Sequence, residues 1–480
     1  MRSPLTLLAV GALCVALAAC GSQLDPDTVA QVNGTTAGGV AGTVDDGTTG
    51  AGDAPGSVTG DGGTGSDSGS TTGGTTDTAG GGSSQQGTGD NSATGSAEAG
   101  SCQGFKNQTG ITDDTITIAN ASDISGPVPG IFESAQQATR AYAAYFNSSN
   151  DICGRKLQVE LLDSRADAGA DQQAYTRACD EAFAAVGSMS AFDSGGASAA
   201  QSCGLPDIRS TTVTPDRRDC STCFAAQAVD PGLVPSAMPR YFLSHYRDAT
   251  QHAALLYINA GAAPVNAGAF RAAWDKAGWK VDYFQGIDVS EFNYSPYVQQ
   301  MKDKGIRLVV YVGPYQNTEK LLDAMKQQSM DPDVYLQDST IYDQRFVEEA
   351  GDNGNGVFAY STTGMFDDVS IQEMQLYRSW LDQVKPGAVP NFYGLYAWSA
   401  ARLFVEQAVA LGGKLTRASL VQSVSRVKDW TGNGLHAPQQ VGSKTTANCQ
   451  SILQLNDGTW RNISPGHYMC APLIDSGTGN

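Results

Sequence analysis

Hydrophobic positions after residue 114 alternate between two spacings, one typical of strands and one typical of helices. Residues 115–119 carry β-branched side chains at strand spacing, and residues 131–146 place Ala135, Ala138 and Tyr142 on one helical stripe. Tyr145 and Phe146 continue that stripe. The alternation then predicts strands at 156–162, 184–187 and 207–213, with helices at 170–184 and from 195 onward. This order is typical of a parallel sheet with helices on both faces.

A second series of the same kind follows a longer predicted helix at 232–246. It predicts strands at 252–258, 279–285, 306–312, 334–337 and 357–360, and helices at 266–277, 294–304, 316–328 and 343–350. Helices are predicted again at 370–384, 392–411 and 416–426. Two such series are more than one core usually holds, so the sequence predicts an α/β fold with two doubly wound, Rossmann-like lobes.

The pattern changes near the C-terminus. Residues 451–456 and 459–463 read as two strands joined at Asp457-Gly458, a pair that favours a tight hairpin turn. Cys449 and Cys470 flank this hairpin, so a disulfide between them would hold its ends together.

The first twenty residues have the pattern of an export signal. Arg2 precedes an apolar run at 5–17 that is too short to cross a bilayer. Residues 17–21, Leu-Ala-Ala-Cys-Gly, resemble the lipobox of bacterial lipoproteins, in which the cysteine is acylated and becomes the first mature residue. The resemblance implies a signal peptide at 1–20, a lipid anchor such as palmitate on Cys20, and a place on the outer face of the bacterial cytoplasmic membrane. An ordinary secretory signal with a chance cysteine is the alternative.

Composition predicts a disordered tether at 21–107. Residues 21–100 contain 23 Gly and no Lys, Arg or aromatic residue. A segment of this kind cannot bury enough apolar surface to offset the chain entropy lost on folding. A glycosylated stalk is the alternative role. The remaining residues hold 29 basic and 39 acidic side chains, which argues against nucleic acid as a partner.

Eight cysteines remain after Cys14 and Cys20 are set aside, and an even number in an exported chain favours disulfides. The predicted pairs are Cys179–Cys203 on neighbouring helices, the local pairs Cys220–Cys223 and Cys449–Cys470, and, by elimination, Cys102–Cys153. Cys220 and Cys223 lie in a polar loop where no helix begins at the first cysteine, so a structural bridge is favoured over a redox pair.

The familiar signatures of catalysis are missing from the sequence that follows the tether. It has no Gly-x-Ser-x-Gly, no His-Glu-x-x-His and no phosphate-binding loop. Its four histidines are not at zinc-ligand spacing from a cysteine pair. We therefore predict no catalytic residues, no metal and no cofactor, while an exported enzyme that uses carboxylates in a cleft stays open as an alternative.

Several segments resemble the type I periplasmic binding proteins of the branched-chain amino acid transporter family. Residues 110–118 resemble the family's opening strand, residues 123–127 (Asp-Ile-Ser-Gly-Pro) its first ligand loop, and residues 154–163 its second strand unit. The segment 150–153 and the sequence Asp163-Ser-Arg depart from the family pattern. The resemblance implies two lobes joined by a three-strand hinge, with lobe 1 at 108–230 and 355–440 and lobe 2 at 231–354 and 441–480.

Candidate ligand-binding residues follow from this fold, because ligands of open α/β sheets bind at the carboxyl ends of strands. The candidates on lobe 1 are Phe132, Ser190, Ala191 and Thr214, the last three as holders of a carboxylate. Core packing for Phe132 and helix capping for Ser190 are the structural alternatives.

On lobe 2, Tyr315 is expected to close over the ligand and Asp338 to face a ligand amine, or else to cap its loop. The family's further aromatic residue is missing, since Gly261-Ala-Ala-Pro264 occupies its place. Amides, urea-like compounds, aromatic acids and peptides are therefore open as ligands beside amino acids.

The resemblance predicts a monomeric, lipid-anchored protein that delivers a small polar solute to an ABC permease. A sensor domain that signals to a membrane receptor is the alternative within the class of binding proteins.

Overall fold

The computed structural model describes residues 99–478. The predicted signal peptide, Cys20 and residues 21–98 of the predicted tether lie outside the described residues.

The first sheet is parallel throughout and has the strand order β2–β1–β3–β4–β5. Its elements in chain order are β1 (Thr115–Ser122), α2 (Glu133–Ser149), β2 (Lys156–Asp163), α3 (Ala168–Glu181), β3 (Ala184–Val186), α4 (Ala197–Cys203), β4 (Asp207–Thr211), α5 (Pro215–Asp219) and β5 (Cys223–Gln227). Three later helices join them: α12 (Gln372–Val384), α13 (Phe392–Leu411) and α14 (Arg417–Val424).

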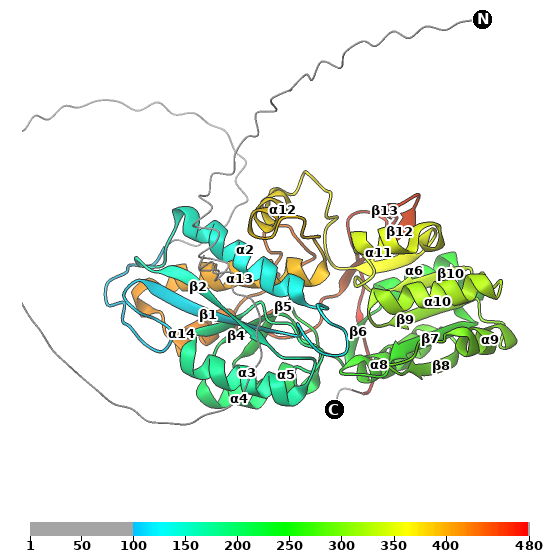
Figure 1. Ribbon diagram of the computed structural model, residues 1–480, viewed down its shortest axis with the longest axis horizontal. Coiled ribbons are helices and arrows are strands. Elements are labelled where there is room, and N and C mark those ends of the chain that lie inside the picture. The colour runs from blue at the N-terminus through cyan, green and yellow to red at the C-terminus, as the bar shows by residue number, and fades with distance from the viewer. Residues whose placement is uncertain (1–98, 479–480) are drawn as a thin grey trace, which may run out of the picture. The chain divides into compact units, whose positions relative to one another are not determined.

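Alternation along β1 explains how this sheet is covered on both faces. Ile116 and Ile118 belong to the core that α2, α12, α13 and α14 form on one face, whereas Ala119 and Ala121 belong to the core under α3 and α4. In Figure 1, α2 and α3 lie on opposite sides of β1 and β2. The predicted strand–helix alternation therefore produces the expected layered lobe.

The second sheet has the order β13–β12–β11–β10–β9–β7–β8, and strands β7 to β11 are parallel. Its elements are β7 (Ala253–Ile258), α8 (Ala263–Ala277), β8 (Val281–Ile287), α9 (Ser295–Asp303), β9 (Leu308–Val312), α10 (Tyr315–Gln327), β10 (Val334–Gln337), α11 (Gln344–Ala350), β11 (Phe358–Ser361), β12 (Cys449–Asn456) and β13 (Thr459–Asn462).

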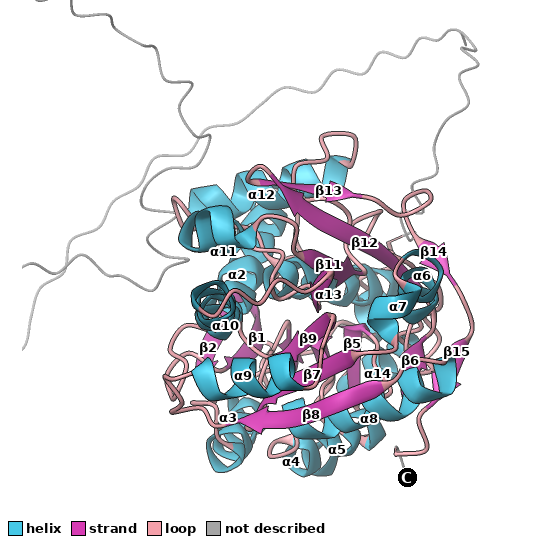
Figure 2. Ribbon diagram, turned by 90° about the vertical axis from the view of Figure 1, so that its right-hand side faces the viewer, coloured by secondary structure: helices cyan, strands magenta, loops and turns pink. Residues whose placement is uncertain are grey.

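Helices again cover both faces of this sheet. Helices α9, α10 and α11 pack on one face, and α6 (Ala237–His245), α7 (Arg247–Thr250) and α8 pack on the other (Figure 2). The predicted hairpin is β12 and β13, which pair antiparallel across Asp457-Gly458. This hairpin is an antiparallel addition to a parallel sheet, and β14 (Met469–Cys470) pairs beside it.

Three sequence-based expectations need correction. The helix predicted at 232–246 begins only at Ala237, because residues 233–235 form the strand β6 (Leu233–Pro235). This strand pairs with the C-terminal strand β15 (Leu473–Asp475). Local periodicity does not reveal a partner that lies so far away in the chain. Strand β5 was not predicted from its short apolar run. Strand β11 pairs with β10, so residues 358–361 belong to the second sheet although the predicted lobe 1 began at 355.

Within the described residues the chain passes between the two sheets at 228–232, 362–371 and 425–448. The first and last of these segments are tied together, since the Asp230 N–H donates to Thr446 Oγ1 at 2.7 Å and the Thr446 hydroxyl donates to the Asp230 carbonyl at 2.9 Å. The connections thus lie close to one another, as a hinge between two lobes requires.

Disulfides join Cys102–Cys153, Cys179–Cys203, Cys220–Cys223 and Cys449–Cys470, the same pairs that the sequence analysis predicts. In the described part of the chain, each links residues of one lobe, so none restrains movement of one lobe against the other. In residues 99–478 we find no helix with both the length and the apolar character that crossing a bilayer requires.

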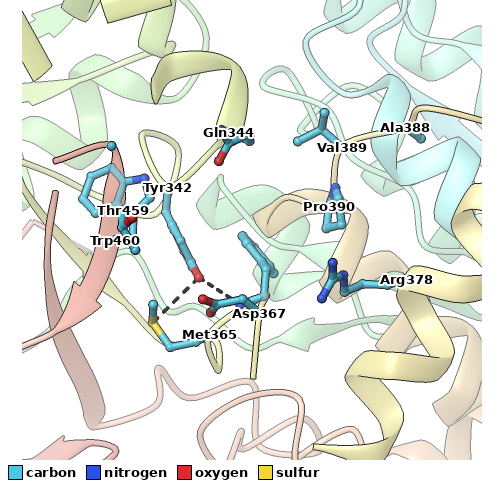
Figure 3. A pocket seen from close by; sticks show the side chains of 12 residues that line it. Tyr342, Gln344, Met365, Asp367, Arg378, Ala388, Val389, Pro390, Thr459 and Trp460 are labelled. Carbon is cyan, nitrogen blue, oxygen red and sulfur yellow. Dashed lines mark hydrogen bonds between the residues drawn. The ribbon is translucent and has the colours of Figure 1, made fainter. Parts of the chain in front are cut away.

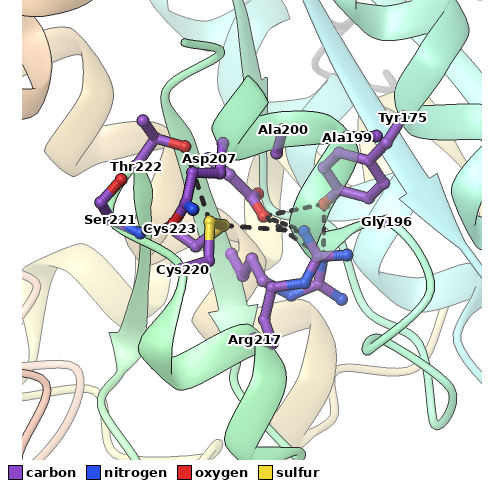
Figure 4. The surroundings of a disulfide bond; sticks show 12 residues. Tyr175, Gly196, Ala199, Ala200, Asp207, Arg217, Cys220, Ser221, Thr222 and Cys223 are labelled. Atoms are coloured by element: carbon purple, nitrogen blue, oxygen red, sulfur yellow. Dashed lines mark hydrogen bonds and ion pairs between the residues drawn. A yellow bond between two sulfur atoms is a disulfide. The ribbon is translucent and has the colours of Figure 1, made fainter. Parts of the chain in front are cut away.

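A buried ionic network lies in the first lobe, and Figure 4 shows two of its members, Arg217 and Asp207, beside the Cys220–Cys223 disulfide. Arg217 of α5 lies 2.9 Å from Asp171 of α3 and 2.9 Å from Asp207 of β4, and its Nε donates to the Asp193 carbonyl at 2.7 Å. Arg209 of β4 adds contacts to Asp193 and Asp207 at 3.8 and 3.5 Å. All five side chains are fully enclosed.

Burial raises the pKa of Asp193 and Asp207, while the two guanidinium groups oppose that rise. The carboxylates therefore depend on the arginines to stay charged inside the protein. Because the members come from α3, β4, α5 and the loop after β3, the network fixes that loop relative to the sheet.

We predict that Arg217→Met lowers the free energy of unfolding by about 3–5 kcal/mol, because Asp171 and Asp207 would stay buried without their shared cation. The neighbouring Arg218 is the matched control. It is partly exposed and pairs with Asp219 and Asp230, so Arg218→Met should cost only about 1 kcal/mol. Urea unfolding with intact disulfides measures both values. Equal small losses would contradict a structural role for the network.

Candidate ligand-binding site

The carboxyl ends of the parallel strands of both sheets bear the loops that carry the predicted ligand residues. The two lobes touch there, since the Ala262 N–H donates to the Ala191 carbonyl at 3.0 Å. Gly261 permits this approach: its φ is +54°, and a Cβ atom at this position would lie 2.7 Å from the Ala191 oxygen. The sequence Gly261-Ala-Ala-Pro264 thus makes a direct contact between the lobes.

Phe132 lies at the start of α2, directly after the first strand unit. Its ring meets that of Tyr393 edge to face, with centroids 4.6 Å apart. Only 2 % of Phe132 is exposed, whereas Tyr393, at the start of α13, is partly exposed. Phe132 therefore packs behind the partly exposed ring of Tyr393. The role of Phe132 as a direct ligand contact stays a prediction.

Ser190 and Ala191 follow β3, as predicted, and both are tied to Asp123 at the end of β1. The Ala191 N–H donates to Asp123 Oδ2 at 2.8 Å, and the Ser190 hydroxyl also bonds this carboxylate. The other oxygen of Asp123 accepts from the Ser164 hydroxyl at 2.6 Å and from the Ala166 N–H at 3.1 Å. One buried carboxylate thus joins the ends of β1, β2 and β3.

Thr214 caps α5, which begins at Pro215. Its hydroxyl donates to Asp193 Oδ1 at 2.5 Å, and Asp193 Oδ2 accepts from the Val213 N–H at 3.0 Å. The residue predicted to hold a ligand carboxylate therefore holds a carboxylate of the protein itself, one that belongs to the buried ionic network.

Tyr315 begins α10 and points into the second lobe. Its side chain is 7 % exposed, the Arg345 guanidinium lies 5.6 Å from the ring centroid, and the ring also contacts Phe346. Burial raises the pKa of Tyr315 to about 12. The expected closure of Tyr315 over a ligand stays a prediction, because in this structure the ring packs against α11.

Asp338 follows β10, as predicted, and is partly exposed. Its Oδ1 accepts from the Thr340 N–H at 3.0 Å and from the Thr340 hydroxyl at 2.5 Å. Burial raises the pKa of Asp338, and its charge in turn helps to raise the pKa of Tyr360 and Tyr393.

Tyr360 and Tyr393, which also lie near these loops in the chain, are not among the predicted ligand residues. Tyr360 lies on β11. The face of the sheet to which its side chain points could not be predicted before the order of the strands was known. Tyr393 follows Asn391, whose side chain caps α13 by accepting from the Gly394 N–H. That capping pattern was a usable signal, since it marks a helix start.

Two cavities flank the connection at 362–371, and neither contains the six predicted residues. One, of about 350 Å³, is lined by Tyr342, Phe366 and Trp460, with Arg378 and Asp367 at its edge (Figure 3). The other, of about 380 Å³, is lined mainly by hydroxyl, amide and histidine side chains. Both lie beside the hinge, and each is lined in part by the loop that follows the carboxyl end of β11. Among the residues that the structure describes, no cluster of three or more His, Cys, Asp or Glu side chains could hold a metal ion.

Comparison with known proteins agrees with this geometry. Residues 115–459 match the sequence profile of the periplasmic binding protein family. No curated protein matches the sequence significantly. Many solved structures share the fold.

One is the branched-chain amino acid transporter substrate-binding protein of Streptococcus pneumoniae in complex with isoleucine (15 % identity, TM-score 0.62, 75 % of this chain and 100 % of that chain). Another is an ABC transporter solute-binding protein of R. palustris in complex with 4-hydroxybenzoate (14 %, 0.61, 75 % and 97 %). A third is a fatty acid ABC transporter substrate-binding protein from Thermomonospora curvata (16 %, 0.62, 79 % and 97 %).

The identities are low, so these structures establish the fold and not the ligand. The family profile covers most of the chain and includes both sheets. Its members are extracytoplasmic binding proteins and not enzymes. The chain therefore belongs to the periplasmic binding protein family, with the type I fold of the branched-chain amino acid ABC transporter substrate-binding proteins.

Proposed function

We propose that this protein is an extracytoplasmic, lipid-anchored substrate-binding protein that delivers a small polar solute to an ABC importer. The observation that carries the proposal is the meeting of two lobes at their strand ends, where the Ala262 N–H after β7 donates to the Ala191 carbonyl after β3 at 3.0 Å. A solute held between the two lobes at these strand ends would touch both of them and so favour the closed arrangement.

The hinge supports a closing movement. In residues 99–478 every disulfide stays within one lobe, and the lobes are joined by chain segments that lie side by side. Such connections allow rotation with small changes in backbone angles. A membrane permease would then recognise the closed form. We propose that the protein delivers its solute as a monomer.

The ligands named for proteins of the same fold support a small solute. Isoleucine, 4-hydroxybenzoate and fatty acids are named for proteins of the same fold, and all are small organic molecules. They differ in charge and shape, which means that the strand-end side chains of each chain determine what it binds.

We predict that a solute bound at this site stabilises the protein and closes it. A solute at 100 times its dissociation constant should add about 2.7 kcal/mol to the free energy of unfolding. A thermal-shift screen of amines, amides, amino acids and aromatic acids identifies the solute, and small-angle scattering then measures the radius of gyration with and without it. A solute that binds without reducing the radius, or that is converted to a product, would contradict the proposal.

The attachment of the chain to lobe 1 supports the proposed anchor. The Gly100 N–H donates to the Val409 carbonyl at 2.9 Å, the Gly413 N–H donates to the Ser101 carbonyl at 2.8 Å, and Cys102 is bonded to Cys153. The described chain therefore begins with residues that are fixed to lobe 1, and we propose that the anchor is joined to this lobe.

We predict that Cys20→Ser releases the protein into the medium, because the acyl chains would have no attachment point. Cys14→Ser, within the apolar part of the signal, is the matched control and should leave the protein with the membrane. Fractionation of expressing cells and mass measurement of the mature N-terminus decide between the outcomes. Membrane retention of the Cys20 variant would contradict lipid anchoring.

A further inference from the structure

The cavity of about 350 Å³ beside the connection at 362–371 has walls from both lobes (Figure 3). Arg378 of α12 comes from lobe 1, whereas Tyr342 and Trp460 come from lobe 2. Phe366 of the connection also lines the cavity, and its side chain packs against the cores of both lobes. The volume is within the range of roughly 300–1,000 Å³ that is typical of sites for small organic molecules.

Aromatic rings form much of the cavity wall. Tyr342 and Phe366 are stacked with their ring centroids 4.4 Å apart, and Trp460 meets Tyr342 edge to face at 5.6 Å. Val389 and Pro390, which precede α13, add apolar side chains from lobe 1. A flat aromatic ring is the shape that such surfaces accommodate best, because it buries its faces against apolar atoms and its edges against other rings.

A donor without a partner lines the cavity on the side of lobe 2. Only 6 % of Trp460 is exposed, and its Nε1 is enclosed and has no hydrogen-bond partner among the described residues. The indole N–H can donate but not accept, and a buried donor is costly to leave unpaired. The Tyr342 hydroxyl, by contrast, already accepts from the Phe366 N–H at 2.8 Å. The cavity therefore favours a molecule that brings a hydrogen-bond acceptor to Trp460.

A cation lies on the opposite side of the cavity. Figure 3 shows Arg378 across the cavity from Trp460. Arg378 is exposed, and it forms no hydrogen bond or ion pair with another residue of the described chain. Asp367 lies at the same edge, is exposed as well, and does not pair with Arg378. A guanidinium can donate two parallel hydrogen bonds to one carboxylate, which adds to the attraction between the charges.

From these contacts we infer that the cavity beside the hinge binds aromatic carboxylates, with the ring against the aromatic wall, an acceptor atom at Trp460 Nε1 and the carboxylate at Arg378. None of the six residues predicted from the strand ends lines this cavity, so the inference adds a second site and goes beyond the proposed function. Because its walls belong to both lobes, a molecule bound there favours one arrangement of the lobes over another.

Four small molecules separate the groups at issue. 4-Hydroxyphenylacetate carries the ring, the acceptor and the carboxylate. Phenylacetate lacks the hydroxyl group, 4-hydroxyphenylacetamide lacks the charge, and tyramine has the opposite charge. Isothermal titration of the mature protein should give 4-hydroxyphenylacetate the lowest dissociation constant, by about two- to tenfold, because one hydrogen bond or one exposed ion pair changes an affinity by that factor.

Substitutions of exposed side chains locate the binding. Arg378→Gln should weaken the binding of 4-hydroxyphenylacetate about two- to fivefold, and Asp367→Asn should strengthen it by a similar factor, because the two charges act on an anion in opposite directions. Lys385→Gln is the matched control. It removes an exposed cation just beyond the end of α12 that does not line the cavity, so the affinity should stay the same.

Trp460→Phe tests the enclosed donor. This variant keeps an aromatic ring and loses the N–H, so the preference for 4-hydroxyphenylacetate over phenylacetate should disappear while phenylacetate binds as before. If the variant does not fold, Arg378→Gln and Asp367→Asn decide.

Three results would overturn the inference: tighter binding of tyramine than of 4-hydroxyphenylacetate, an affinity for 4-hydroxyphenylacetate that Arg378→Gln leaves unchanged, or binding of none of the four molecules. Each of them leaves the proposed function standing, because the solute screen with its measurement of closure tests the strand-end site separately.

Discussion

Parallel pairing of strands is the constraint on which the rest of this structure depends. In both sheets the strands from β1 to β5 and from β7 to β11 run in one direction, so every loop that leaves a strand end emerges at the same edge. The helices that return the chain cover both faces and close the core. What remains open to a solute is the edge where the two sets of strand ends meet.

Carboxylates organise that edge in two different ways. Asp123 and Asp193 are buried and saturated with hydrogen bonds, and they hold the loops after β1, β3 and β4 in place. Among the described residues, the Asp338 carboxylate accepts only from Thr340, and both of these hydrogen bonds go to Oδ1. The same residue type therefore differs between the two lobes in the number of donors that each carboxylate has received from the protein.

The disulfides and the ionic network strengthen each lobe separately. Cys220–Cys223 lies beside Arg217, whose Nη1 is 3.8 Å from Cys223 Sγ, and Cys449–Cys470 fastens the C-terminal hairpin. Cys102–Cys153 fixes the incoming chain to lobe 1. Rigid lobes joined by adjacent segments at the hinge can move as bodies, which a binding protein that signals occupancy by closure requires.

The sequence by itself determined the fold class and the order of most elements, because these depend on periodicity. It also determined the cysteine pairs, because three of them are local or lie on neighbouring helices and Cys102–Cys153 then remains by elimination. Asp338 follows β10, and Ser190 and Ala191 follow β3, as the pattern of strands predicts, while their contact with a solute stays a prediction. Tertiary structure decided what these groups contact. The pairing of β6 with β15, the place of β11 in the second sheet, and the capture of Ala191 and Thr214 by Asp123 and Asp193 join residues far apart in the chain. Local patterns carry no information on such pairs, since only the packed sheets bring them within hydrogen-bond distance.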